Sequence, residues 1–166
     1  MSQLRIKYFT TKVGSGKTPR GGAEVYQDQG IPLFRSQNVT NEGLLLDDIA
    51  YISEDIDEEM AFTRTKPLDV LLNITGASLG RCYYIPNDFV RANVNQHVCI
   101  IRPIQKIVIT TYLYYLIVSP VGQEQIKLAL TGGNRDGLSF EVIRNLSFNI
   151  PSIFEQQNIV EYLDSK

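Results

Sequence analysis

The sequence predicts a mixed α+β fold: a curved β body, barrel- or β-helix-like, with helices and a C-terminal helix beginning near Ser152. Short runs rich in β-branched and aromatic residues, bounded by Gly, Pro and Asn, predict the strands. Apolar segments that follow helix-starting residues predict the helices. The 166 residues are 43% hydrophobic and 20% charged, which is typical of a globular domain that buries about 70% of its unfolded surface.

Five short segments have the character of strands, and Gly or Pro marks the boundary of most of them. Gly30 precedes the first, Pro103 ends the fourth, and Pro151 follows the fifth. A loop of small residues, 75–80, joins the second strand to the third, and a glycine-rich loop covers residues 13–22. The predicted strands are residues 31–35, 69–74, 81–85, 94–101 and 146–150.

Helices are predicted where a capping residue precedes a suitable first turn. Ser53 can cap a short helix whose first turn is acidic, where carboxylates favour the helix dipole. Ser119 and Pro120 suit the N-cap and first position of a helix that runs to about residue 130 and stops at Gly132. Two further helical segments are predicted at residues 112–117 and 140–144.

The C-terminal helix carries the clearest signals. Ser152 and Glu155 have the spacing of a capping box. Helices shorter than about 12–15 residues are marginal alone, so this one must gain stability from packing. We expect residues 1–151 to form one domain and residues 152–166 to begin a longer spacer helix that is truncated here. The apolar side chains predicted to pack on a partner helix are Ile153, Ile159, Val160 and Leu163.

The composition excludes several classes of protein. Every apolar run is shorter than the roughly 20 residues of a membrane-spanning helix, and the N-terminus lacks the apolar core of a secretory signal. Cys82 and Cys99 are therefore expected to be reduced, packed thiols. A single His and two Cys give no cluster with metal-ligand spacing. We expect a cytoplasmic protein with no membrane contact, no metal and no cofactor.

The charge is unevenly distributed, although the net charge is only −2. Residues 42–59 hold eight of the 18 acidic side chains and no Lys or Arg. The other residues hold 16 basic and 10 acidic side chains, a net of +6. This segregation fits a protein that meets phosphate on one side only, although an acidic segment is more often a solvated face.

No complete set of catalytic residues is present. The segment from Gly14 to Thr18 resembles the end of a phosphate-binding P-loop, but Thr11 replaces its first glycine and Pro19 interrupts the helix that should follow. Ser78 lies in a Gly-x-Ser-x-Gly sequence, the pattern of a nucleophile elbow. The single histidine, His97, follows it by only 19 residues, and no helix is predicted after Ser78. We therefore predict no catalytic residue and no enzymatic activity.

Polar side chains in the loops are of the types that contact DNA. Asn and Gln pair with adenine and Arg with guanine, while Lys and Arg also bind phosphate. Each of them, taken alone, is more often a solvated loop residue. We predict that Lys17 contacts phosphate and that Arg135, in a glycine-bounded loop, reads a guanine. The candidate DNA-binding residues are Lys17, Thr18, Arg20, Arg35, Gln37, Asn38, Ser78, Asn93, Gln96, Asn134 and Arg135.

Six segments follow one another in a distinctive order. The most specific is Ile150-Pro151 followed by Glu155-Gln156 and Ile159, and the second most specific is Gly16-Lys17-Thr18-Pro19. The others are Gly30-Ile31-Pro32-Leu33, Lys66-Pro67-Leu68-Asp69-Val70-Leu71, Asn95-Gln96 and Gly132-Gly133-Asn134-Arg135. This order resembles the target recognition domain of type I restriction–modification specificity subunits, over nearly the whole chain.

The resemblance implies a domain that reads one half of a bipartite DNA target and so directs methylation and restriction. It implies four kinds of partner: double-stranded DNA, the methyltransferase (modification) subunits, the restriction subunit, and a second recognition domain or a second copy of the chain. Two alternatives stay open at this point. One is a protein-interaction or assembly module without DNA binding, and the other is a nucleotide-binding enzyme fragment.

Overall fold

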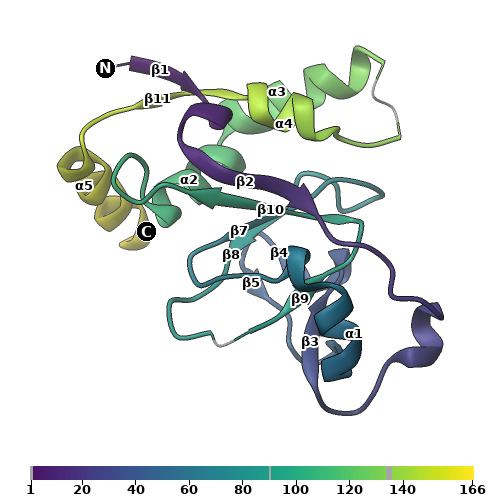
Figure 1. The fold of residues 1–166 in the computed structure, drawn as a ribbon. Coiled ribbons are helices and arrows are strands. Elements are labelled where there is room, and N and C mark those ends of the chain that lie inside the picture. Colours follow the sequence, from purple (N-terminus) through teal and green to yellow (C-terminus); the bar gives the residue numbers. More distant parts are fainter. Residues whose placement is uncertain (1, 90, 134–135) are drawn as a thin grey trace.

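The computed structural model describes residues 2–89, 91–133 and 136–166 (Figure 1). Its strands are β1 Ser2–Arg5, β2 Thr10–Ser15, β3 Ile31–Phe34, β4 Val39–Thr40, β5 Gly43–Leu44, β6 Ala50–Ile52, β7 Val70–Asn73, β8 Cys82–Tyr84, β9 Asn93–Val94, β10 Val98–Pro103 and β11 Ser147–Ile150. Its α-helices are α1 Glu54–Glu59, α2 Thr110–Val118, α3 Pro120–Thr131, α4 Phe140–Asn145 and α5 Ile153–Asp164. Short 3-10 turns cover Ile6–Tyr8, Gly22–Val25, Ser36–Asn38 and Ala61–Thr63. The prediction of a mixed α+β fold is confirmed.

The antiparallel sheet β2-β10-β7-β8 separates two cores. Successive side chains of β10 point to opposite faces of this sheet. Cys99 and Ile101 join a core that includes side chains of α2, α3, α4 and α5, while Val98 and Ile100 join a second core with β3 and β9. Both faces are covered, so β7 and most of β10 are buried, which explains why their sequences are continuous apolar runs.

The N-terminal strands β1 and β2 are not among the predicted elements. In β2 only Val13 is buried, because β2 is an edge strand whose other side chains are polar or glycine. The apolar alternation that identifies a strand is therefore missing. The strand β1 pairs with β11 from the opposite end of the chain, with Leu4 facing Phe148, and no local pattern could show that partner.

The predicted strand at residues 94–101 is two strands, β9 and β10. The break falls at Asn95, whose Oδ1 accepts a hydrogen bond from the His97 backbone N–H over 3.0 Å. Asn side chains commonly stabilise turns by bonding the backbone two residues ahead. This turn lets the chain leave the three-stranded sheet β6-β3-β9 and enter the four-stranded one.

Four of the five predicted helix starts are confirmed by their caps; α2 begins after Ile109 with no side-chain cap. Ser53, Ser119 and Ser139 each accept a hydrogen bond from a first-turn N–H through the side-chain oxygen. Ser152 and Glu155 form both bonds of the capping box, at 3.3 and 3.0 Å. No helix among the described residues has the length and apolar character needed to cross a bilayer.

The pairing of the described strands does not close a barrel. The four-stranded sheet ends at β2 on one side and β8 on the other, and the remaining described strands form separate sheets of three, two and two strands. The coarse α+β prediction thus holds, whereas the barrel- or β-helix-like description of the β body gains no support from strand pairing.

The two cysteines are free and buried, as expected. Cys82 and Cys99 both face Leu72, one on each neighbouring strand. Two inter-strand spacings separate their Cα atoms by about 9–10 Å, beyond the roughly 7 Å limit of a disulfide. Burial raises the pKa of the Cys99 thiol to about 12, so it stays protonated and unreactive.

Candidate nucleic-acid interface

The glycine-rich loop after β2 packs on the turn between β9 and β10. The Gly16 N–H donates to the Asn95 carbonyl over 3.1 Å. A Cβ atom at Gly16 would lie only 1.6 Å from the carbonyl oxygen of Val94. Only glycine fits this close approach of two backbones. Gly16 therefore fixes the position of the two residues that follow it.

Those two residues, Lys17 and Thr18, lie beside Gln96. The Thr18 hydroxyl donates to Gln96 Oε1 over 2.6 Å, and both side chains are exposed. The Lys17 side chain is exposed next to them. Three predicted DNA-binding residues, from two segments far apart in the sequence, thus meet at one edge of the molecule. Arg20 is exposed in the same loop.

A third loop joins this edge through His97. Its Nδ1 lies 2.5 Å from Thr75 Oγ1, and its carbonyl accepts from the Ile74 N–H over 3.1 Å. The Leu138 N–H donates to the Ile74 carbonyl over 2.9 Å. This bond places the segment just before α4 next to Thr75 and His97. A Cβ at Gly137 would lie 2.7 Å from the Ile74 oxygen, so this contact also requires glycine.

The predicted base-reading residues Asn134 and Arg135 lie outside the described residues. The described chain resumes at Asp136, next to the contact between Gly137 and Ile74. The described chain that follows them is therefore anchored at the same edge as Thr75 and His97.

Asn73, which the sequence reasoning missed, connects two further loops. Its amide nitrogen donates to the Ser36 carbonyl (2.8 Å), the Val39 carbonyl (3.3 Å) and Ser78 Oγ (3.1 Å), and the side chain is fully buried. The available signal was an Asn at the end of an apolar strand, since such a residue needs partners when buried. Its neighbour Ser78, a predicted site residue, is half-buried and fixed by this bond.

Two predicted DNA-binding residues prove to be interior residues. Asn38 is fully buried, accepts from the Arg35 N–H, and donates to the Leu45 and Asp48 carbonyls. Asn93 is fully buried and donates to Asp57 Oδ1 over 3.0 Å. Their amides are used inside the protein, as buried polar groups must be. The prediction that they read bases is wrong for this structure, and we remove both from the interface.

Arg35 and Gln37 face the acidic segment instead of the edge. Arg35 donates to the Asp48 carbonyl over 2.7 Å, lies 3.7 Å from its carboxylate, and stacks over Tyr26. Gln37 is exposed and donates to Asp48 Oδ2 over 2.8 Å. Both side chains are engaged within the protein, so neither belongs to the group around Thr18 and Gln96.

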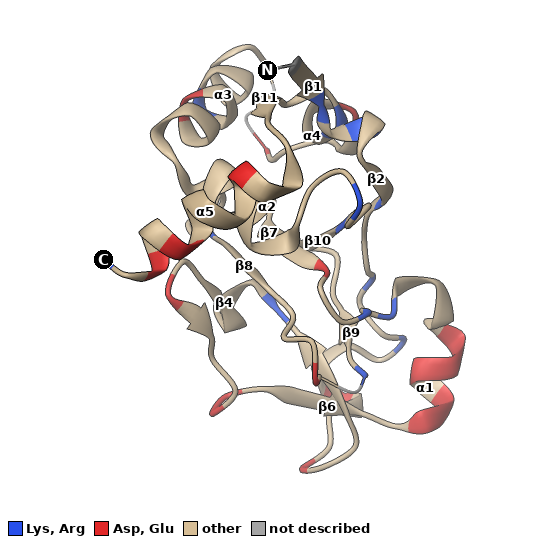
Figure 2. Ribbon diagram, turned by 90° about the vertical axis from the view of Figure 1, so that its left-hand side faces the viewer, with Lys and Arg blue, Asp and Glu red and all other residues tan. Residues whose placement is uncertain are grey.

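The acidic segment is partly a structural ion-pair cluster. Figure 2 shows its acidic residues concentrated on α1. Asp57 of that helix is fully buried, 2.8 Å from Arg64 Nε and 3.1 Å from Arg91. Exposed carboxylates on the same helix bind the same arginines: Glu58 pairs with Arg64 and Glu54 with Arg91. These acids therefore neutralise two arginines rather than forming only a solvated face.

The contacts of Ser78 and His97 give no catalytic arrangement. Ser78 Oγ accepts from Asn73 and His97 Nδ1 contacts Thr75, and within the described residues neither side chain bonds to the other or to a carboxylate. The P-loop reading fails as well, because the chain after Thr18 forms no α-helix and Gly16 packs on protein backbone. No group of three metal-ligating side chains occurs in the described residues.

The C-terminal helix packs on its own domain, which corrects the predicted apolar stripe. Val160 is 8% exposed and belongs to the main core, while Ile153 and Leu163 are half-buried. The buried Gln156 accepts from the Ile109 N–H and donates to the Ile107 and Pro151 carbonyls, so α5 is firmly attached. Of the four predicted partner-helix residues, only Ile159 is exposed, at 39%.

The exposed apolar side chains of α5 lie on its outer face. Phe154 is 71% exposed and Tyr162 62%. A spacing of eight residues puts both on one side of a helix. Neither was in the predicted stripe, because the sequence cannot tell which apolar face of a helix its own domain covers.

Comparison with known proteins points to one family. Residues 6–165 match the family described as the type I restriction modification DNA specificity domain. The chain is 28% identical, over 135 residues, to the EcoBI specificity subunit of the type I restriction enzyme of Escherichia coli. That match covers 81% of this chain and 28% of the relative.

Solved structures share the fold over 99% of the chain. A structure described as showing complex assembly and conformational transition of the type I R-M system has a TM-score of 0.70 at 18% identity, and 37% of it is covered. The S subunit of M. genitalium gives 0.68 at 16% identity with 39% covered. The HsdS subunit of Thermoanaerobacter tengcongensis gives 0.66 at 16% identity with 36% covered. The chain thus spans between about a quarter and two fifths of these relatives.

Proposed function

Because the chain belongs to the family of type I restriction modification DNA specificity domains, we propose that it recognises one half of a bipartite DNA target. In that role it directs methyltransferase and restriction subunits to the target. Its family is one of specificity domains, so the chain is not itself an enzyme. The proposal includes a cytoplasmic location, a domain over residues 1–151 with a spacer helix starting at residue 152, and a curved β body.

The observation that carries this proposal is the meeting of four loops at one edge. Thr18, Gln96, Thr75 and Gly137 come from different parts of the sequence and are held together by the contacts described above. An exposed Lys beside exposed amide and hydroxyl groups matches the chemistry of phosphate and base-edge contacts. Asn134 and Arg135 come directly before Asp136 and Gly137 in the sequence, and we keep them as the proposed base readers.

We predict that Lys17→Ala weakens binding of all duplex sequences about equally. A phosphate contact carries no sequence information, and its loss should lower the slope of log Kd against log salt by about one. The measurement is fluorescence anisotropy of labelled duplexes at several salt concentrations. Lys127→Ala, which removes an exposed Lys from α3, is the matched control and should leave the slope unchanged.

The alternative function, a protein-interaction module, predicts the opposite result for duplex binding. A protein-interaction module without DNA binding would show no salt-dependent duplex binding at any concentration, in the wild-type chain as in the variants. A change of sequence preference with an unchanged salt slope in Lys17→Ala would instead make Lys17 a base-reading residue.

For assembly, we propose that the outer face of α5 contacts a partner helix or methyltransferase subunit. Replacing Phe154 and Tyr162 with Ala should weaken assembly by at least about 1 kcal/mol, roughly fivefold in Kd, because buried aromatic side chains dominate interface energies. Both are exposed, so the thermal stability of the chain should not fall. Glu161→Ala is the control on the same helix. Unchanged assembly in the double variant would remove this face from the interface.

A further inference from the structure

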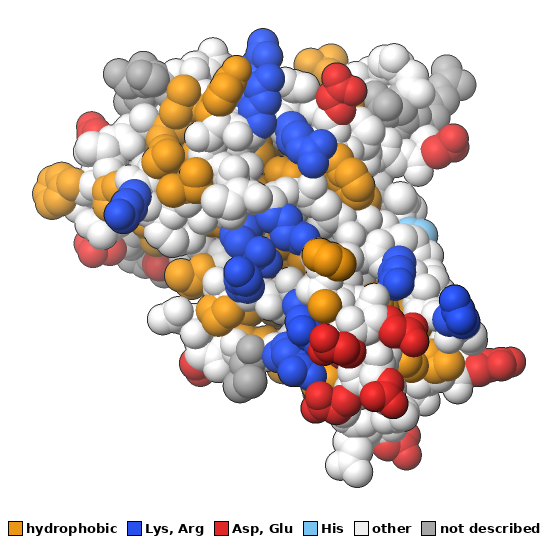
Figure 3. Space-filling view, in the orientation of Figure 1, with side chains coloured by type: hydrophobic (Ala, Val, Ile, Leu, Met, Phe, Trp, Pro, Cys, Tyr) orange, Lys and Arg blue, Asp and Glu red, His pale blue; other side chains and the backbone are white. Residues whose placement is uncertain are grey.

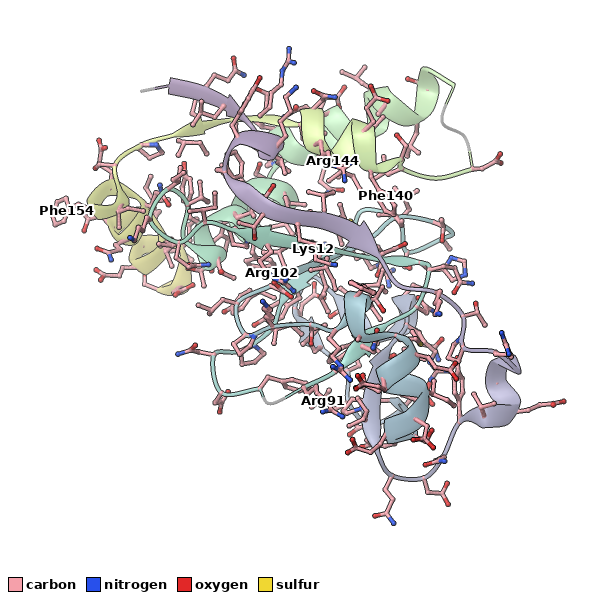
Figure 4. All side chains as sticks on the ribbon, viewed as in Figure 1. Lys12, Arg91, Arg102, Phe140, Arg144 and Phe154 are labelled. Carbon is pink, nitrogen blue, oxygen red and sulfur yellow. The ribbon has the colours of Figure 1, made fainter. Side chains whose placement is uncertain are left out.

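Four cations at the N-terminal side of the domain have no carboxylate partner among the described residues. Elsewhere in the described chain the arginines Arg35, Arg64, Arg91 and Arg102 are neutralised by acids. Figure 3 shows basic side chains running down the middle of one face. Arg102 and Arg91, which lie below Arg144 in the same view (Figure 4), are ion-paired. The four cations at this side are Arg5, Lys7, Lys12 and Arg144, and exposed cations in other parts of the described chain, such as Lys17, Arg20 and Arg81, also lack an ion pair.

Three of these cations surround one shallow pocket of about 300 Å³. It is lined by Lys7, Thr10, Thr11, Lys12, Val13 and Arg144. The fourth, Arg5, lies alongside, with its guanidinium 3.4 Å from the side-chain oxygen of Asn145. The pocket therefore has three cations and two hydroxyl groups in its wall and no acid.

Lys12 stands directly opposite Arg102 across the strands β2 and β10. Like charges directly opposite on an antiparallel pair are destabilising. Burial lowers the pKa of Lys12, and Arg102 lowers it further. Asp69 binds Arg102 at 2.7 Å and acts in the opposite direction on Lys12, raising its pKa. The hydrogen bond of Lys12 within the described residues goes to the Phe62 carbonyl. An anion bound beside Lys12 would offset its repulsion from Arg102.

Arg144 lines the same pocket. It donates to the Val13 carbonyl over 3.0 Å, at the outer edge of β2, and thereby joins α4 to that strand. Figure 4 shows Arg144, Lys12 and Arg102 one below another from α4 across β2 to β10. A guanidinium has five donors, so this one bond leaves others for a phosphate.

The patch lies within reach of a duplex bound at the loop edge. Lys12 and Lys17 are five residues apart on β2 and the loop after it, a span of about 16 Å at roughly 3.3 Å per residue. That equals about five base-pair steps of roughly 3.4 Å. One duplex can therefore touch both positions. The acidic side chains of α1 bound the face below and would repel DNA there.

We propose that Arg5, Lys7, Lys12 and Arg144 bind the phosphate backbone of duplex DNA beside the base-reading edge. The inference rests on the proposed function and adds a second contact region to it. An acidic protein surface is a poorer fit, because five of the six pocket residues are polar or charged and the sixth, Val13, is buried. Protein interfaces have apolar centres, whereas DNA interfaces are polar and strongly basic.

The test compares Lys12→Gln, Arg144→Gln and the double variant with the wild-type chain. Anisotropy of a labelled duplex of random sequence is measured between about 50 and about 200 mM salt. Loss of two phosphate contacts lowers the salt slope by about two, so the fall in affinity over this fourfold salt range should be about tenfold smaller. Arg144→Lys keeps the charge and should retain most of the slope. Lys127→Gln is the control.

Stability provides a second readout. Lys12→Gln removes the like-charge pair with Arg102, so the DNA-free variant should melt no lower than wild type. If the Lys12→Gln/Arg144→Gln double variant is folded and its salt slope equals that of Lys127→Gln, the inference is overturned. The proposed function would remain intact. If the double variant keeps the salt slope of Lys127→Gln but no longer assembles with the methyltransferase, the four cations form a protein contact, and the inference is also overturned. A wild-type chain that binds no duplex refutes the proposed function itself.

Discussion

Asp57→Ala is expected to lower the free energy of unfolding by about 3 kcal/mol, the lower end of the cost of removing one partner from a buried ion pair, because Arg64 and Arg91 are partly exposed. The Asp57 carboxylate is fully buried and receives Arg64, Arg91 and the amide of Asn93. Without it, two guanidinium groups and a buried amide lose their common acceptor. For a chain of this size we expect the melting temperature to fall by about 10 °C.

Glu58→Ala is the matched control on the same helix. Glu58 also binds Arg64, at 2.6 Å, but its side chain is 76% exposed. An exposed pair of this kind contributes only about 0–1 kcal/mol. Urea unfolding of both variants measures the difference directly. If Asp57→Ala is no less stable than Glu58→Ala, the buried cluster does not support the domain.

The Asp57 cluster also matters for the candidate interface. Asn93, which donates to Asp57, is the first residue of β9, and Val94 and Asn95 after it support the Gly16 loop. Loosening the cluster should therefore weaken duplex binding as well as the fold. The acidic segment thus supports the candidate interface from inside, a role that its sequence did not indicate.

Much of the fold could be predicted because its signals are local. The caps at Ser53, Ser119 and Ser152 are set by residues within one helical turn, and the central strands β7 and β10 are continuous apolar runs. The edge strand β2 lacks that signal. Its place depends on β10, which follows it by more than 80 residues of sequence.

The candidate site could be predicted only in part, because residue type does not determine burial. Asn38 and Gln96 are both polar amides in loops, yet Asn38 closes a network inside the protein and Gln96 is exposed beside Thr18. Likewise, nothing in the sequence around Lys12 distinguishes it from an ordinary surface lysine. Its unusual position appears only when Arg102 is found opposite it.

Gly16→Ala is expected to destabilise the chain by about 3 kcal/mol, the upper end of the cost of overpacking. The added Cβ would lie 1.6 Å from the Val94 carbonyl oxygen, which is backbone and cannot move aside like a flexible side chain. The loop must lift away from β9. It would then lose the Gly16–Asn95 hydrogen bond and separate Thr18 from Gln96. Duplex binding should fall together with stability.

Gly14→Ala separates this steric effect from a general loss of glycine flexibility. Gly14 lies two residues earlier, within β2, and a Cβ there meets nothing within 4 Å. Its backbone φ is not in the left-handed region, so Ala should be neutral or stabilise the chain by up to about 1 kcal/mol. Thermal unfolding and duplex anisotropy of both variants distinguish the two positions. Equal behaviour of Gly14→Ala and Gly16→Ala would contradict the close packing of the loop on β9, and with it the alignment of Lys17, Thr18 and Gln96.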